Sequence, residues 1–343
     1  MARNAPFWAP ENHAARRPRL LKRAQIAKAL RAFFEREGFI EIEPSALQVS
    51  PGNETHISGF ATRFERLGRP PAPYFLHSSP EFDCKKLLAA GETRIFSLAH
   101  VFRNGERTLL HHPEFTMLEW YRAQAPFRDL IDDCAAVLAV TAKAAGAFEF
   151  RFRRSSLDPF APAEILTVTD AFARYAGIDL PAVLQDRDAL AHEAARLGMR
   201  VVADDSWSDL FSKIVSEKIE PNLGHGRATA MIDYPASEAA LARRKPEDAR
   251  FAERFELYAC GVELANAFGE LTDPAEQRRR FEADMVERSR LYGSAYPIDE
   301  DFLAAVAVMP PASGAALGFD RLVMLATGAD HIEDVLWTPV AAP

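Results

Sequence analysis

The sequence lacks the patterns that mark secreted, membrane-spanning and common nucleotide-binding proteins. Its three cysteines lie far apart and form no CxxC pair, which argues against a disulfide framework and a zinc site. The N-terminus has no apolar signal-peptide core. The longest apolar-looking stretch, 127–148, contains three aspartates and a lysine, so it predicts an amphipathic helix rather than a membrane span. Neither GxGxxG nor a P-loop pattern occurs. We therefore expect a soluble cytoplasmic protein.

The chain also has little positive charge for a protein that binds nucleic acid over a broad surface. Lys and Arg number 41 against 49 Asp and Glu, which gives a net charge of −8 over 343 residues. A local basic patch is still compatible with this balance. The hydrophobic fraction of 48% and the charged fraction of 26% are typical of a globular chain that is long enough to bury a sizeable core.

The order of the predicted elements indicates an α+β fold rather than a parallel, doubly wound sheet. Residues 1–17 show no periodicity and are expected to form a loose N-terminal arm. Ile26, Leu30 and Phe34 recur at helical spacing on one apolar face. Residues 150–225 are expected to form a helical insertion. The predicted strands are 40–43, 94–102, 114–121, 229–234 and two more within 248–270. Long antiparallel strands with helices at both ends are typical of this class.

The strongest chemical signal lies in the segment FRNGERTLLHHPEFTMLEWY. Side chains alternate along a strand, so its second half places four residues on one face: Phe115, Met117, Glu119 and Tyr121. A buried strand face would rarely carry an unpaired carboxylate such as Glu119, because burial of the charge is costly. A hairpin would aim Arg103 at the same face. The alternative is a solvent-facing strand with a surface salt bridge.

A second signal lies in the segment FELYACGVELANAFGELTD. If Ala259 and Cys260 form the turn of a hairpin, Glu256 lies directly across from Glu263. Two neighbouring carboxylates repel each other unless a cation lies between them, and Mg²⁺ held by carboxylates and phosphates is the natural candidate. Three more residues share one face of the continuing strand: Asn266, Phe268 and Glu270. The alternative is a solvated acidic edge.

A third segment, ALGFDRLVML, predicts a strand that runs into an apolar helix. Gly318 at the junction would let the backbone approach a ligand closely. Arg321 follows one turn into the helix, and arginine is well suited to phosphate oxygens. Alone, this segment is a weak signal, because an arginine near a helix start is usually a surface residue.

Together the three segments resemble the signature motifs of class II aminoacyl-tRNA synthetases, in the lysyl-tRNA synthetase branch. Residues 20–44 are similar to motif 1, residues 102–121 to motif 2 and residues 316–325 to motif 3. The resemblance covers about residues 18–338. It implies a catalytic core in residues 18–343, built as an antiparallel sheet flanked by helices. It also implies ATP and Mg²⁺ as cofactors and a homodimer formed through the motif 1 region.

The resemblance implies roles for single residues. The implied ATP-binding set is Arg103, Asn104, Gly105, Glu106, His112, Phe115, Glu263, Leu264, Gly318 and Arg321. The implied substrate-binding set is Ser79, Pro80, Glu81, Glu119, Tyr121, Asn266, Glu270 and Ala316. The implied Mg²⁺ ligands are Glu256 and Glu263.

Within these sets, the resemblance gives catalysis to two arginines. Arg103 would bridge the α-phosphate of ATP and the substrate carboxylate, and Arg321 would lie against adenine or the γ-phosphate. Glu81 would bind the amine near the carboxylate. The distal ammonium would be held by Glu119, Tyr121 and Glu270. The chemistry of the residues agrees, because a dibasic amino acid needs carboxylates at the far end of its pocket. Adenylation needs no general base, since the substrate carboxylate is itself the nucleophile.

The sequence departs from a lysyl-tRNA synthetase in several places. Only about 20 residues precede motif 1, so we expect no anticodon-binding domain. Gly105 stands where motif 2 normally has Glu, with Glu106 one place later, and His112 stands where Asn is common. Ala316 stands where motif 3 usually has glycine. His111 and His112 lack further metal-ligand spacing and are expected to be loop residues.

Because of these features the chain resembles the elongation factor P β-lysine ligases. These paralogues of lysyl-tRNA synthetase attach (R)-β-lysine to a lysine side chain of elongation factor P. The expected partners are therefore β-lysine or lysine and elongation factor P, with no stable tRNA binding. Two alternatives stay open. One is a synthetase-like enzyme that aminoacylates tRNA or another small acceptor. The other is a non-catalytic paralogue that senses lysine-like ligands or binds a partner.

Overall fold

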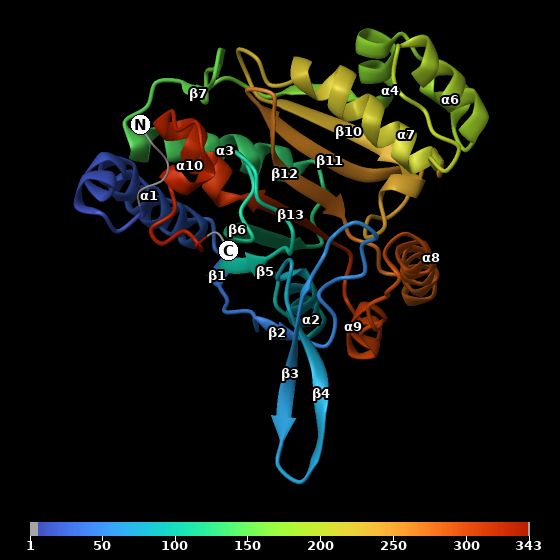
Figure 1. Ribbon diagram of the computed structural model, residues 1–343, viewed down its shortest axis with the longest axis horizontal. Helices are drawn as coiled ribbons and strands as arrows, with labels where there is room; N and C mark the ends of the chain where they lie inside the picture. The colour runs from blue at the N-terminus through green and yellow to red at the C-terminus, as the bar shows by residue number, and fades with distance from the viewer. Residues whose placement is uncertain (1–5, 342–343) are drawn as a thin grey trace.

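The computed structural model describes residues 6–341, and its centre is an eight-stranded sheet (Figure 1). The strands lie in the order β1-β5-β6-β13-β12-β11-β10-β9. Their bounds are β1 Ile40–Glu41, β5 Arg94–Phe102, β6 Glu114–Ala123, β9 Glu164–Thr167, β10 Thr229–Pro235, β11 Phe251–Ala259, β12 Val262–Gly269 and β13 Ala312–Gly318. Only the edge pairs β1–β5 and β9–β10 are parallel. This arrangement confirms the predicted α+β fold.

Three helices cover one face of the sheet and form the main core with it (Figure 1). Their bounds are α1 Pro10–Arg36, α3 Asp129–Ala145 and α10 Phe319–Thr327. The predicted apolar face of α1 is confirmed, because Ile26, Leu30 and Phe34 are fully buried. They pack in one cluster with Leu118 and Trp120 of β6. The apolar stripe of a helix and one face of a strand thus supply the two layers of the core.

The prediction for the N-terminus was partly wrong. Helix α1 begins at Pro10, so residues 10–17 are helical rather than a loose arm. Proline is tolerated in the first turn, where its missing N–H would have no partner within the helix. Residues 1–5 of the predicted arm lie outside the described residues. Although α1 is 27 residues long, neither it nor another helix within residues 6–341 is long and apolar enough to cross a bilayer.

The stretch 150–225 is mostly helical and packs on the far end of the sheet. Its regular elements, besides β9, are β7 Phe150–Phe152, β8 Ser155–Leu157, α4 Val168–Ala171, α5 Leu180–Val183, α6 Arg187–Arg196 and α7 Trp207–Ile214. Short π-helical turns follow α4 and α7, at Phe172–Ala176 and Val215–Ile219. Phe172 and Phe211 stack at 5.1 Å between ring centroids and share a second core cluster with Tyr258 of β11.

A third group of helices lies near the lower end of the sheet in Figure 1. Their bounds are α2 Glu81–Ala89, α8 Pro274–Tyr292 and α9 Glu300–Val306. The rings of Phe82 and Phe302 stack at 4.0 Å between centroids, and Phe281 joins them. Phe268 of β12 packs against this cluster. The side chain of Phe268 thus faces away from the main core, which places α2, α8 and α9 beside the other face of the sheet.

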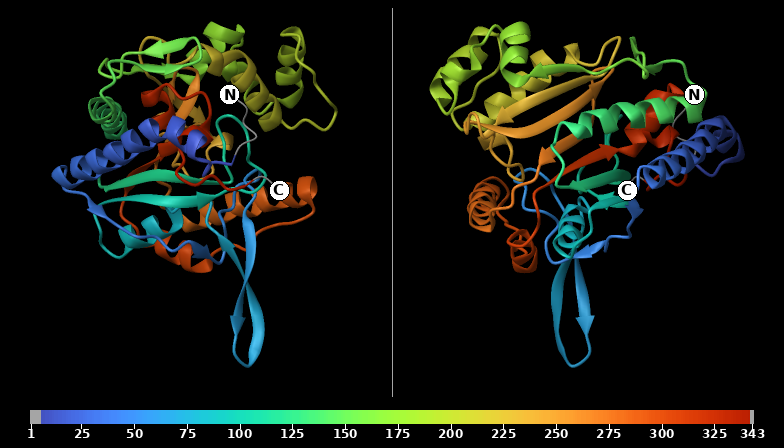
Figure 2. Two further views of the ribbon diagram at one scale, coloured as in Figure 1. Left: turned by 60° about the vertical axis from the view of Figure 1, so that its left-hand side comes forward. Right: turned by 180° about the vertical axis from the view of Figure 1, so that it is seen from behind.

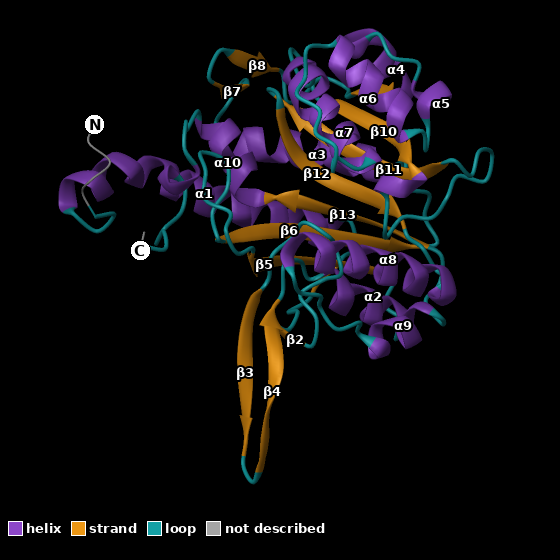
Figure 3. Ribbon diagram, turned by 45° about the vertical axis from the view of Figure 1, so that its right-hand side comes forward, coloured by secondary structure: helices purple, strands orange, loops and turns teal. Residues whose placement is uncertain are grey.

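A separate three-stranded sheet projects from the body of the molecule (Figures 2 and 3). It contains β2 Leu47–Gln48, β3 Phe60–Arg66 and β4 Arg69–Leu76. Strands β3 and β4 form a long antiparallel hairpin. The segment 49–59, which connects β2 to β3, has no regular structure and leads back to the body.

Candidate active site

A cavity of about 290 Å³ lies on the sheet face opposite α1, α3 and α10. The alternation of side chains along β6 explains its position. Leu118 and Trp120 belong to the main core, whereas Phe115 and Met117 line the cavity. The loop between β5 and β6, the segment 49–59 and the start of α10 complete the wall.

Most of the predicted site residues meet at this cavity. Its lining contains Ser79, Glu81, Arg103, Glu106, His112, Phe115, Glu256, Glu263, Leu264, Asn266, Ala316, Gly318 and Arg321. Three predicted residues are fully or almost fully buried next to it: Glu119, Tyr121 and Glu270. Pro80, Asn104 and Gly105 do not line it. The N–H of Asn104 donates to Ser58 O at 2.6 Å, and Gly105 has a φ of +83°, which favours glycine. The roles of all these residues stay predictions.

Two arginines that differ in their hydrogen bonding line the end of the cavity that is suited to anions. Arg103 directly follows β5, and its guanidinium lies 5.3 Å from the ring centroid of Phe115. The buried Nε of Arg103 has no hydrogen-bond partner among the described residues. Arg321 is fixed, because it donates to Glu263 O at 2.8 Å and to Leu110 O at 3.3 Å. A buried, unpartnered N–H group beside a fixed arginine is suited to bind phosphate or carboxylate oxygens.

The turn of the β11–β12 hairpin differs from the prediction. Ala259 still belongs to β11, and the two-residue turn is formed by Cys260 and Gly261. Both turn residues have positive φ, 56° and 72°, as the tight hairpin turns that match the strand twist require. The register also shifts between Leu257 and Tyr258, which marks a β-bulge.

The position of the turn overturns the predicted pairing of the two acids, and the bulge shifts the partner of Glu256 by one more residue. Glu256 lies opposite Asn266, and Glu263 lies opposite Tyr258. Both carboxylates nevertheless line the cavity. Burial and the charge of Glu256 raise the pKa of Glu263. Glu256 itself forms an ion pair with Arg254. The two acids therefore share one site without facing each other across the hairpin.

This pair of acids fits a divalent cation that is held jointly with phosphate. Mg²⁺ in enzymes is usually bound by one or two carboxylates together with substrate phosphates. Between Pro6 and Ala341, no group of three or more His, Cys, Asp or Glu side chains is arranged to hold a metal ion. A cation at Glu256 and Glu263 would therefore depend on the phosphate oxygens of a nucleotide.

The inner end of the site holds three buried carboxylates and one buried lysine. Lys85 is fully buried and forms ion pairs with Glu81 and, at 2.6 Å, with Glu270. Glu119 accepts a hydrogen bond from Tyr121 at 3.0 Å and another from Ser79. No ion pair to Glu119 occurs in the part of the chain that the structure describes. Burial raises the pKa of Glu119 to about 8, and the charge of Glu81 adds to this effect. Burial also raises the pKa of Glu270 to about 7, although Lys85 opposes the shift.

Strand β13 approaches these acids closely because it carries a glycine. A Cβ at Gly314 would lie 2.2 Å from the ring of Tyr121 and 2.6 Å from Glu270 Oε1, so a side chain does not fit there. Two residues further along, Ala316 lies opposite Glu119 and lines the cavity. The methyl group of Ala316 thus borders the space between the anion end and the acids.

Two residues that sequence reasoning did not place in the site orient others. Arg254 donates to Asn266 Oδ1 at 3.1 Å and pairs with Glu256. His111, predicted to be an ordinary loop residue, lines the cavity and contacts Arg321 with 2.6 Å between Nε2 and Nη2. Burial and the charge of Arg321 lower the pKa of His111, which favours the neutral ring as a hydrogen-bond acceptor.

Of the site residues that the sequence analysis did not name, some could have been found from their spacing and others could not. Lys85 lies four residues after Glu81, which places both on one helix face. Arg254 lies two residues before Glu256, which places both on one strand face. Glu54, which also lines the cavity, is in a stretch without periodicity and could not have been found this way.

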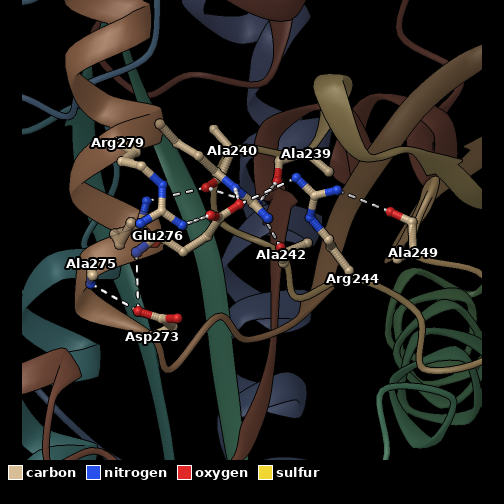
Figure 4. A network of polar contacts seen from close by, with 11 residues as sticks. Ala239, Ala240, Ala242, Arg244, Ala249, Asp273, Ala275, Glu276 and Arg279 are labelled. Carbon is tan, nitrogen blue, oxygen red and sulfur yellow. Dashed lines mark hydrogen bonds and ion pairs between the residues drawn. The ribbon is translucent and has the colours of Figure 1, made fainter.

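The segment that carries Leu241 into the cavity wall is anchored to α8 (Figure 4). Arg280 of α8 donates to Ala239 O at 2.7 Å and to Ala242 O at 2.8 Å. Glu276, one turn earlier, pairs with Arg280 at 3.0 Å. These contacts satisfy carbonyl groups of an irregular segment and so fix this wall of the cavity.

Comparison with known proteins gives a consistent result. A family model described as "tRNA synthetases class II (D, K and N)" matches residues 11–341. The chain is 40% identical over 319 residues to the elongation factor P–(R)-β-lysine ligase of Haemophilus influenzae strain PittGG, covering 92% of this chain and 93% of that protein. It is 40% identical over 333 residues to the protein of that name from Sodalis glossinidius, covering 96% of each. It is 36% identical over 331 residues to the lysine–tRNA ligase of Dehalococcoides mccartyi strain 195, covering 96% of this chain and 65% of that protein.

Proposed function

The chain belongs to the class II tRNA synthetase family of the D, K and N type, and from this premise we propose its reaction. As a member of that family it is an ATP-dependent ligase. We propose that it activates (R)-β-lysine as an aminoacyl-adenylate and transfers the β-lysyl group to a lysine side chain of elongation factor P. The names of the ligases to which it is similar support this substrate and this acceptor.

The balance of charge at the inner end of the cavity carries the proposal. Glu81 and Glu270 pair with Lys85, and Glu119 lies near them without a cation, so two negative charges are left when all four groups are ionised. A dibasic amino acid supplies two ammonium groups, which would neutralise them. A neutral or acidic amino acid would leave buried carboxylates without partners, at a cost of several kcal/mol in general.

The first step would join the substrate carboxylate to the α-phosphorus of ATP and release pyrophosphate. Arg103 lines the cavity with its Nε unpartnered, and its guanidinium would donate to oxygens of both reactants. Arg321, held by backbone carbonyl groups, would bind the nucleotide without having to reorganise. Mg²⁺ bound by Glu256, Glu263 and phosphate oxygens would neutralise charge on the phosphates. The residues thus contribute position and charge rather than proton transfer.

The second step would form an amide bond. The neutral ε-amine of the acceptor lysine attacks the carbonyl carbon of the adenylate, AMP leaves, and the amine loses one proton to solvent. The similarity supports a protein as the acceptor, because the chain is 40% identical to the elongation factor P ligases and 36% identical to the lysine–tRNA ligase. The net charge of −8 also disfavours a broad tRNA-binding surface.

Pyrophosphate exchange with a panel of amino acids tests the activation step. We expect exchange with (R)-β-lysine and with L-lysine, and none with L-norleucine, which has the shape of lysine without its distal ammonium. Equal exchange with norleucine, or no exchange with any amino acid, would contradict the proposed substrate class.

A further inference from the structure

Glu54 is a cavity carboxylate that the charge balance described above leaves out. It lies in the segment 49–59, and the residues on either side of it, Asn53 and Thr55, are each held by a hydrogen bond. The buried Asn53 donates to Pro297 O at 3.2 Å, and Thr55 donates to Asp284 Oδ1 at 3.1 Å. The backbone at Glu54 is therefore held on each side, while its side chain lines the cavity. Such anchoring presets the position of a carboxylate before a ligand arrives.

The carboxylate of Glu54 differs from most others that line the cavity. Glu81, Glu256, Glu263 and Asp320 each have a Lys or Arg nitrogen within 4 Å. Among the residues from 6 to 341, no hydrogen bond or ion pair holds Glu54. Glu106 also has no ion pair there, but it lies near His111 at the ATP end. Glu54 is thus an anchored acid without a cation.

Glu54 lies on the amine side of the cavity, close to Glu81. The two side chains line the main cavity together and also line a small adjoining one, with Ser79 and Phe82. The side chain of Glu54 is exposed to the open cavity. The surrounding protein raises the pKa of this carboxyl, the charge of Glu81 raises it further, and Arg103 opposes the shift. Two acids in this relation gain from a cation between them. One oxygen of Glu81 is already engaged by Lys85, so the pair has room for one more cationic group.

We propose that Glu54 is a specificity-determining residue that, with Glu81, binds the substrate amine nearer to the carboxylate. This inference rests on the proposed function. Glu119 and Glu270 remain the acids for the distal ammonium. Glu54 reaches the cavity from a segment outside the sheet. We expect its position relative to Glu81 to favour an amine on the second carbon beyond the carboxylate, as in β-lysine, over one on the first, as in lysine.

A comparison of two ligands isolates this contact. 6-Aminohexanoate has the carboxylate and the distal ammonium of both lysine and β-lysine but lacks the second amine. Calorimetric titration of the full chain, with a non-hydrolysable ATP analogue present, would measure the Kd of (R)-β-lysine, L-lysine and 6-aminohexanoate. For Glu54→Gln we expect the affinity for β-lysine to fall about 10- to 100-fold, the range typical of a hydrogen bond between charged groups. The affinity of Glu54→Gln for 6-aminohexanoate should be unchanged. The ratio of its Kd values for lysine and β-lysine should be closer to one than in the unmodified chain.

A control variant shows whether any effect is specific to Glu54, and the pattern of results shows whether the role of Glu54 or the proposed function fails. Glu65→Gln removes the same charge from the exposed β3–β4 hairpin and should change none of the three affinities. Equal weakening of β-lysine and 6-aminohexanoate by Glu54→Gln, or weakening of neither, would overturn the role of Glu54 while the proposed function stands. Failure of the unmodified chain to bind β-lysine or lysine would overturn both.

Discussion

At the scale of single residues, the site separates into an arginine end and an acidic end. Arg103 and Arg321 line one end of the cavity. Glu119 and Glu270 are buried at the opposite end, and burial raises the pKa of both carboxyls. A substrate with a carboxylate at one end and an ammonium at the other matches this polarity.

Arg103→Ala tests the arginine end. Because its Nε has no partner in the structure as described, its removal should leave the fold unchanged. Pyrophosphate exchange should fall about 10²- to 10³-fold, as is typical when one donor to the reacting centre is lost. Arg107→Ala is a suitable control, since Arg107 lies in the same loop but pairs with Glu333 outside the cavity lining. Near-normal exchange by Arg103→Ala would remove Arg103 from the mechanism.

Ala316→Gly tests how the position of the amine is selected. The methyl group of Ala316 lines the cavity between the arginine end and the acidic end, and the α-amine of lysine would have to fit beside it. Its removal should shift the ratio of kcat/KM toward α-lysine by about 10- to 200-fold, the range for one methyl-sized group in a pocket. The ratio is measured by pyrophosphate exchange with both amino acids. An unchanged ratio would mean that Ala316 does not set the choice.

The pKa of about 8 at Glu119 predicts a pH dependence of binding. Below pH 8 this carboxyl is protonated in the free protein, whereas an ammonium group binds its ionised form. Binding must then release a proton, so affinity for β-lysine should rise about tenfold per pH unit from pH 6 to pH 8 and level off above. Calorimetry over this range measures the slope, and Glu119→Gln should abolish it. A flat profile for the unmodified chain would place the distal ammonium elsewhere.

At the scale of elements, strands and helices with a visible hydrophobic period could be predicted from the sequence, whereas bulges, turns and irregular segments could not. The β5–β6 hairpin and the strand–helix junction at Gly318 were predictable because period 2 and helical spacing are visible in the sequence. The β11–β12 register was not, because a bulge after Leu257 and a positive φ at Cys260 leave no mark in the residue pattern. For the same reason, the segment around Glu54 could not be placed in the site.

Gly314→Ala tests the close approach of β13 to the acids. An added Cβ would collide with Tyr121 and Glu270, both buried, so overpacking should cost about 1–3 kcal/mol of stability. Thermal unfolding should show a lower Tm, and the affinity for β-lysine should also fall. Ser313→Ala is the control, because the buried Ser313 Oγ has no partner among the described residues and its loss should be nearly neutral. An unaltered Tm and Kd for Gly314→Ala would mean that the neighbouring side chains move aside freely.

At the scale of the whole molecule, the fold class could be predicted from the order of elements, but the surface could not. The helical character of 150–225 was predicted, but its packing against β11 and the projection of the β3–β4 hairpin (Figure 2) depend on contacts between distant segments rather than on local periodicity. The homodimer through the motif 1 region stays a prediction. Leu21 and Ile40, with 41% and 57% of their surface exposed, are apolar side chains of this region that such an interface would cover.

The acceptor is tested most directly by the intact mass of elongation factor P. The factor would be incubated with the full chain, ATP, Mg²⁺ and (R)-β-lysine, and total tRNA would be treated in parallel under the same conditions. We predict that elongation factor P gains one β-lysyl group on a lysine side chain, only when ATP is present, and that tRNA is charged poorly or not at all. Unmodified elongation factor P together with efficient charging of tRNA would contradict the proposed function.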